Sequence, residues 1–252
     1  TEGFLLVGAL LLVVSIFVSK LSFKFGVPTL LLFLMVGMLF GSDGVGIEFS
    51  NMKYAQAIGI VAMSIILFSG GMDTKFSDIK PIVVPGLILS TLGVVLTAII
   101  TGFFIYLLSK SAIIAITFSL PVSILLASTA ASTDSASVFS ILRGQNIGLK
   151  NNLRPMLELE SGSNDPVAYI MTITMIGAVT SGEGLSWTLA LNFVVQLLVG
   201  ALFGYLFGKL GVLVVNKINL HNTSLYPILV LCFIFITYSS TYFLNGNGYL
   251  SV

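Results

Sequence analysis

A carboxylate and an amide, Asp165 and Asn164, are adjacent within a long apolar segment near residues 154–180. A helix of this length extends about 39 Å at about 1.5 Å per residue, which is enough to cross a lipid bilayer. Asp165 then lies near the middle of the membrane, where an ionised Asp costs roughly 2.5–3.5 kcal/mol. Such a residue indicates a functional site. The structural alternative is an Asp that is permanently protonated or paired with a neighbouring helix.

Further polar groups accompany Asp165 on this segment. At about 100° per residue, one helical face carries Glu158, Ser161, Gly162 and Asp165. The adjacent face carries Asn164 and Glu160. Carboxylate, hydroxyl and amide oxygens are hard ligands, which suit Na⁺ or K⁺ and not a transition metal. Arg154 lies one turn before Glu158, and we expect a structural ion pair between them near the membrane interface.

A second intramembrane acid, Asp134, lies in a run of small polar residues, LLASTAASTDSASVF at 125–139. Ser and Thr compete with a helix for backbone hydrogen bonds, so the run favours unwinding. Unwound backbone persists at membrane depth only where it faces protein or water, and its carbonyl groups can then ligate a cation. We expect non-helical backbone at residues 129–134, with a carbonyl group facing Asp165. If a helix resumes at Ser135, Asp134 is either its N-terminal cap or an ion ligand.

These two stretches resemble the motifs of the monovalent cation/proton antiporters. Members of that family carry a Thr-Asp pair followed by small residues on one helix, and Glu-Ser-x-x-Asn-Asp on the next. Here the motifs read Thr133-Asp134-Ser135 and Glu160-Ser161-Gly162-Ser163-Asn164-Asp165. The stretch STLGVVLTAIITG at 90–102 is also similar, and GSNDP is most similar to the potassium/proton branch, although family members also move Na⁺. Ser135 departs from the Pro that many relatives carry there.

The resemblance implies an inverted-repeat fold of about thirteen helices, in which two broken helices cross in a core domain that moves against a dimerisation domain. It implies a homodimer. It also implies that Asp165 binds the proton and the cation alternately and that Asn164 stabilises it. Oxygen ligands would come from Thr133 and Ser161, and Glu160 would support the site by hydrogen bonds. One carboxylate holds one H⁺ or one monovalent cation, so we expect one-for-one, electroneutral exchange unless Glu160 also titrates.

The elements that position these residues are membrane helices. Hydrophobic residues make up 56% of the 252 residues and charged residues only 8%, whereas a soluble domain carries roughly 25% charged residues. We therefore expect an all-α protein in contact with membrane lipid, with one transmembrane domain over residues 1–252. Hydropathy and turn signals divide it into about eight helices, near 3–19, 28–42, 55–72, 81–107, 115–142, 154–180, 187–216 and 224–244.

The two ends of the chain point to a longer protein. The chain begins at Thr1 without a methionine, and after the last predicted helix the sequence NGNGYLSV turns into an apolar start. We expect a piece cut at the beginning of a ninth segment. The resemblance places the repeat partner of the fifth segment beyond Val252.

The basic residues predict the orientation. Alternate loops hold nine of the eleven Lys and Arg residues, and only Lys53 and Lys110 fall on the other side. Loops on the cytoplasmic side concentrate Lys and Arg. This predicts a cell (inner) membrane protein with its N-terminus outside.

Other classes of protein have less support. The net charge of +1 and the scattered basic residues give no indication of nucleic-acid binding. The lone Cys232 and the loop residue His221 form no metal site, and we expect no cofactor besides the transported ions. An intramembrane hydrolase lacks a base at depth beside Ser161 and Ser163. A monovalent cation channel or a non-transporting membrane subunit are the alternatives to an antiporter.

Two further features have structural interpretations. Gly200, Gly204, Gly208 and Gly211 form a stripe of small residues, which predicts close helix packing. Trp187 is expected at the membrane interface as an anchor.

Overall fold

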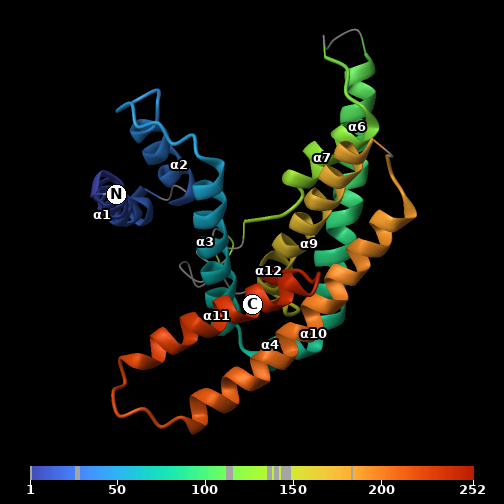
Figure 1. Ribbon diagram of the computed structural model, residues 1–252. Helices are drawn as coiled ribbons and strands as arrows, with labels where there is room; N and C mark the ends of the chain where they lie inside the picture. Colours follow the sequence, from blue (N-terminus) through green and yellow to red (C-terminus); the bar gives the residue numbers. More distant parts are fainter. Residues whose placement is uncertain are drawn as a thin grey trace. The chain divides into compact units, whose positions relative to one another are not determined.

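The computed structural model describes residues 2–25, 29–111, 116–134, 138, 142, 149–182 and 184–252. All regular secondary structure in these ranges is helical (Figure 1). Contacts divide the chain into two compact units, Thr1–Gly59 and Ile60–Val252, and each unit is described by itself.

The first unit contains α1 (Glu2–Phe25) and α2 (Thr29–Phe40), which pack against each other, and the start of α3 (Met52–Asp73). Asn51 caps α3, because its Oδ1 accepts hydrogen bonds from the backbone amides of Lys53 and Tyr54 at 3.0 and 3.2 Å. These amides belong to the helix start, where the helix itself supplies no acceptor. Many large apolar side chains of α1 and α2 are exposed, as suits helices that face lipid.

The second unit begins with the rest of α3, followed by one long helical stretch. This stretch has five consecutive pieces: α4 (Phe76–Ile79), η1 (Lys80–Ile82), α5 (Val83–Ile88), η2 (Leu89–Gly93) and α6 (Val94–Lys110). η2 is a single π-helical turn, in which hydrogen bonds span five residues where an α-helix spans four. It packs against α9, and Ser90 within it is buried.

Three helices, α6, α7 (Leu120–Thr129) and α9 (Leu153–Ser181), lie side by side in this unit (Figure 1). Gly102 permits the approach of α6 to α7, because a Cβ atom there would lie 2.7 Å from the Cα of Ile124. Two small apolar clusters fill the contacts with α9. The first contains Ala98, Ile124, Met171 and Met175. The second contains Val94, Val167 and Ala168. Within the fifth predicted segment, 115–142, α7 covers residues 120–129, and part of the remainder lies outside the described residues.

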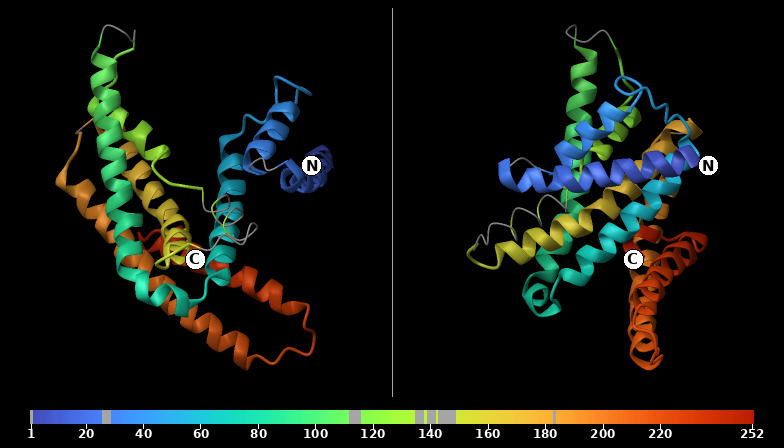
Figure 2. Two further views of the ribbon diagram at one scale, coloured as in Figure 1. Left: turned by 180° about the vertical axis from the view of Figure 1, so that it is seen from behind. Right: turned by 90° about the vertical axis from the view of Figure 1, so that its left-hand side faces the viewer.

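The last three helices are α10 (Trp187–Lys217), α11 (Leu225–Phe243) and the short α12 (Gly248–Ser251). α10 and α11 form a long hairpin (Figure 2). The predicted close packing of the glycine stripe is confirmed at Gly200 and Gly204, where a Cβ would lie 2.9 Å from a backbone oxygen of the segment around α12. At Gly208 no atom of the described residues lies within 4 Å of such a Cβ, so close packing there stays a prediction.

A chain of tyrosine rings links α9 to the end of the second unit. The ring of Tyr249 in α12 meets Tyr169 of α9 edge-on at 4.8 Å between centroids and Tyr238 of α11 at 5.0 Å. The Tyr238 hydroxyl also donates a hydrogen bond to Tyr249. Such edge-to-face contacts stabilise beyond the area they bury, so α9, α11 and α12 are held together at this level.

Helix length and composition suit a membrane. Four described stretches are long and apolar enough to cross one: Met52–Met72, Ser77–Lys110, Trp187–Lys217 and Leu225–Phe243. Three apolar helices are shorter: Leu5–Lys20, Leu31–Phe40 and Leu120–Thr129. α9 carries the polar motif, and its 29 residues extend about 44 Å. Trp187 is 81% exposed at the start of α10, as expected of an interfacial anchor.

Candidate cation and proton site

The helix break predicted from the Ser/Thr run is present. α7 ends at Thr129, and residues 131–134 are not helical. The prediction of a break is therefore confirmed, although Thr129 itself still belongs to the helix. Beyond the break, the amide of Val138 donates to the carbonyl oxygen of Asp134 at 3.1 Å. This spacing of four residues is that of a helix that starts again.

α9 passes the break as an uninterrupted helix, with Pro166 inside it. Ser161 and Asn164 are fully buried, and Glu160 and Asp165 are half-buried. Gly86 of α5 lets this part of α9 pack closely, because it leaves room for the side chain of Leu159; a Cβ on Gly86 would lie 2.6 Å from Leu159 Cδ2. With Leu159 held against α5, the next two residues of α9 turn toward the break.

Thr133 is where the break and α9 meet. Its hydroxyl donates to Ser161 Oγ at 3.0 Å, with Glu160 Oε2 as a more distant acceptor at 3.5 Å. The same oxygen accepts from Asn164 Nδ2 at 2.6 Å. The Ser161 hydroxyl lies 3.4 Å from the Thr133 carbonyl oxygen, which it can reach as a donor. Both the side chain and the backbone of Thr133 are therefore tied to α9.

Asn164 has a fixed orientation within this network. Its Nδ2 donates both to Thr133 and to Glu160 Oε1, the latter at 3.0 Å. A flipped amide would instead turn its oxygen toward the Glu160 carboxylate. In the observed orientation Asn164 Oδ1 is buried, with no hydrogen-bond donor in the described part of the chain. Buried acceptors nearly always have a partner, so this oxygen suits a ligand that brings positive charge.

Asp165 lies beside this network. The Ser132 hydroxyl donates to its carboxylate, and the charges of Asp134 and Glu160 act on it. The sequence predicted a backbone carbonyl turned toward Asp165. The Thr133 carbonyl is directed to Ser161, and the described contact from the break to Asp165 is the Ser132 side chain. The expected carbonyl stays a prediction. Ser132 and Thr133 are adjacent and contact different residues of α9.

Asp134 directly follows the break. Its carbonyl oxygen accepts a hydrogen bond from Val138, four residues on, as that of an N-cap residue does. Its charge also acts on Asp165. Ser135, which the sequence singled out as the departure from the family pattern, lies outside the described residues. Both interpretations of Asp134 therefore remain compatible with its position.

Sequence reasoning missed one contact and anticipated another. Ser132, the donor to Asp165, was not singled out, although it belongs to the same Ser/Thr run as Thr133. The expected pair between Arg154 and Glu158 is present, with Nε at 3.2 Å from Oε1.

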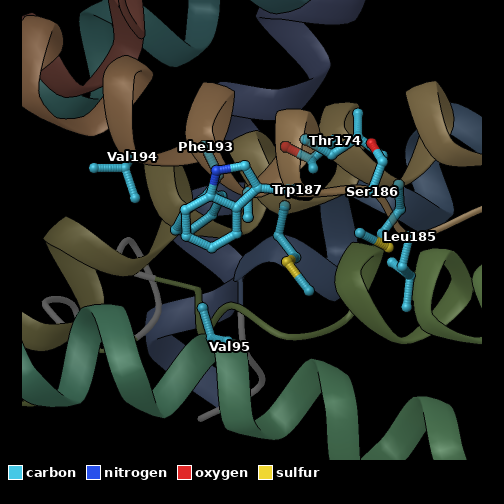
Figure 3. A pocket seen from close by; sticks show the side chains of 11 residues that line it. Val95, Thr174, Leu185, Ser186, Trp187, Phe193 and Val194 are labelled. Atoms are coloured by element: carbon cyan, nitrogen blue, oxygen red, sulfur yellow. The ribbon is translucent and has the colours of Figure 1, made fainter.

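One apolar cavity lies away from this network. It has a volume of about 450 Å³ and lies between α6, α9 and the start of α10. Figure 3 shows Val95, Trp187 and Phe193 around it, with Thr174 and Ser186 as its polar residues. None of the motif residues lines it. Its apolar walls offer no charge for a cation, so we assign the site to the network around Thr133 and Asp165.

Fold and site together define a membrane protein with a broken helix joined to a polar motif helix. The chain belongs to the family of sodium/hydrogen exchangers (transmembrane), whose family model matches residues 8–252. It is 36% identical over 249 residues to a K(+)/H(+) antiporter, NhaP, of Alkalimonas amylolytica, covering 98% of this chain and 42% of that protein. It is 38% identical over 256 residues to a K(+)/H(+) antiporter, NhaP2, of Shewanella oneidensis, covering 100% and 42%.

A solved structure shows the fold. The sodium proton antiporter MjNhaP1 of Methanocaldococcus jannaschii, determined at pH 8, matches with a TM-score of 0.77 at 20% identity. The match covers 100% of this chain and 60% of that one. The predicted fold class, an all-α membrane protein with an antiporter fold, is thus confirmed. The chain spans 42% of the length of the two K(+)/H(+) antiporters above.

The network gives Thr133 a structural role. Replacing Thr133 by Val keeps its shape but leaves one proton of buried Asn164 Nδ2 without an acceptor, which should destabilise the protein by about 1–3 kcal/mol. Thermal unfolding of the purified complete protein measures this effect. Thr129→Val is the matched control, because that exposed hydroxyl bonds only within α7, to Leu126 O at 2.8 Å. Equal melting temperatures for the two variants would contradict the network.

Proposed function

We propose that this chain is the N-terminal part of a transmembrane antiporter domain, over residues 1–252, that exchanges K⁺ or Na⁺ for H⁺. The observation that carries the proposal is the junction of the helix break with α9, where hydroxyl, amide and carboxylate oxygens of Thr133, Ser161, Asn164 and Glu160 gather beside Asp165. The similar NhaP and NhaP2 proteins, named as K(+)/H(+) antiporters, favour K⁺, and MjNhaP1 is a sodium proton antiporter.

Asp165 is the group for which the two ions compete. The cation binds to its carboxylate, with oxygen ligands from Thr133 and Ser161, and the proton binds to the same carboxylate in its absence. Asn164 stabilises the site, because its amide is held by Thr133 and Glu160. Asp134 caps the resumed helix and contributes negative charge. The transported ions are substrates, and the exchange needs no cofactor and no covalent chemistry, so the protein acts as a transporter and not as an enzyme.

Neutrality of the loaded carboxylate explains why exchange is obligatory. Asp165 with a proton or with a monovalent cation carries no net charge, whereas the empty carboxylate is penalised by the membrane. Only the loaded forms then cross. This distinguishes an antiporter from a channel, whose filter needs rings of ligands from several subunits.

Asp165 provides the direct test. Asp165→Asn should abolish cation-dependent proton movement in proteoliposomes of the complete protein, followed with a pH dye and K⁺, Na⁺ or Li⁺. The amide accepts neither the proton nor the ionic charge. Asp134→Asn should reduce exchange less, because a neutral Asn still caps a helix. Unchanged exchange by Asp165→Asn, in a protein that unfolds at the wild-type temperature, would exclude this mechanism and favour a non-transporting subunit.

Stoichiometry tests the roles of Asp165 and Glu160 together. Glu160 accepts hydrogen bonds from Asn164 and is within reach of Thr133, so we assign it to the support of the site and not to proton transport. One exchanging carboxylate predicts one H⁺ per cation. The exchange rate should then not respond to a membrane potential that is imposed separately from the K⁺ and H⁺ gradients. Net charge movement in reversal-potential measurements would show that a second acid titrates.

The protein is proposed to lie in the cell (inner) membrane as a homodimer, with its N-terminus outside and the loops rich in Lys and Arg in the cytoplasm. Single cysteines at positions 150 and 217, both described as exposed, should then react with an impermeant thiol reagent only from the cytoplasm. A cysteine at position 53 should react only from outside. Reaction of positions 53 and 150 from the same side would require a different topology.

A further inference from the structure

A small cavity of about 140 Å³ lies between α3, α4 and α9, away from the Thr133 network. Its apolar wall comes from α3 and Ile79, and its polar groups are the side chains of Thr74, Glu158 and Ser163. Three glycines, Gly70, Gly71 and Gly162, keep it open. We call it the Glu158 cavity. It is large enough for a cation with a few waters, since one water occupies about 30 Å³ of liquid.

The carboxylate of this cavity is buried, and Arg154, with which it forms an ion pair, is partly exposed. Glu158 is 9% exposed as a residue, and the side chain of its partner Arg154 is 35% exposed. Arg154 is also the second residue of α9. The positive end of the helix dipole therefore disfavours the charge of Arg154 at this position. In addition, a pair four residues apart on a helix is weaker when the basic residue precedes the acid, as it does here. Arg154 is therefore a counter-ion that can be displaced toward water.

The remaining polar groups supply oxygen ligands. The Thr74 hydroxyl donates its proton to the Gly70 carbonyl oxygen at 2.8 Å, so its lone pairs are available to a cation. Ser163 adds a second hydroxyl. These hard ligands with one carboxylate suit a monovalent cation, because a divalent ion would keep a positive charge against an apolar wall.

The cavity lies on the same face of α9 as Asp165. Glu158 and Asp165 are seven residues apart in one helix, which places them on one face about 10 Å apart along its axis. Gly162 lies between them on that face and lines the cavity without a side chain. The cavity is near the N-terminal end of α9, beside Arg154. The proposed topology places this end on the cytoplasmic side.

We propose that the Glu158 cavity is a loading site, in which the transported monovalent cation displaces Arg154 from Glu158 before it reaches Asp165. The inference rests on the proposed exchange function. Glu158 binds the arriving cation, and Arg154 competes with it for the same carboxylate. The two residues therefore act in opposite directions on cation binding, although they form one ion pair.

This opposition can be measured as the apparent KM for K⁺ or Na⁺ added at the cytoplasmic side of proteoliposomes. Glu158→Gln should raise KM about tenfold or more, as expected for loss of a charged partner, and leave the maximal rate nearly unchanged. Arg154→Gln should lower KM. An ion pair with only a structural role would move both variants in the same direction. Asp78→Asn, which removes an exposed negative charge of α4, is the matched control and should keep the wild-type KM.

A second variant and a binding measurement separate this inference from the function it rests on. Thr74→Val removes a ligand oxygen without removing charge and should also raise KM, whereas Thr74→Ser should not. In purified Asp165→Asn protein, KCl should still raise the melting temperature relative to choline chloride. In the double variant Asp165→Asn, Glu158→Gln this increase should be lost. Absence of exchange in wild type would overturn the proposed function alone. Normal exchange with KM unchanged in Glu158→Gln, or no KCl shift in Asp165→Asn, would overturn the loading site.

Discussion

The need to give every backbone group at membrane depth a partner is the constraint on which the candidate site depends. Hydrocarbon offers no water to satisfy the groups that a helix break leaves free. Thr133 answers this need within the protein, because its carbonyl and hydroxyl groups both bond to α9. α9 must therefore present hydroxyl, amide and carboxylate groups at the level of the break. The same groups are ones that a cation requires, so the structural solution and the proposed binding site coincide.

Packing without side chains makes this meeting possible. Gly102 brings α6 against the backbone of Ile124 in α7, and Gly86 admits the side chain of Leu159 from α9. The two contacts bring α7 and α9 against the same long helix, and Thr133 contacts Ser161 at 3.0 Å. The polar network is thus positioned by apolar and glycine contacts that lie outside it.

Local sequence signals predicted the parts of this arrangement that are local. The Ser/Thr run around Thr133 predicted the break, and helical spacing predicted the pair of Arg154 and Glu158. Tertiary details were not accessible in the same way. The contact from Ser132 to Asp165 depends on how a non-helical stretch turns, and the packing at Gly208 depends on which helix covers it. The spacing of residues in the sequence contains neither the path of the non-helical stretch nor the identity of the neighbouring helix.

The π-helical turn η2 acts as an insertion of one residue between α5 and α6. Deleting that residue would let the two helices merge, and it would rotate everything after it by about 100° about the helix axis. Val94, Ala98 and Gly102 would then leave their partners in α9 and α7 together. No single side-chain substitution can reverse such a change of phase. The turn therefore resists stepwise loss in evolution, even though none of its residues belongs to the binding motif.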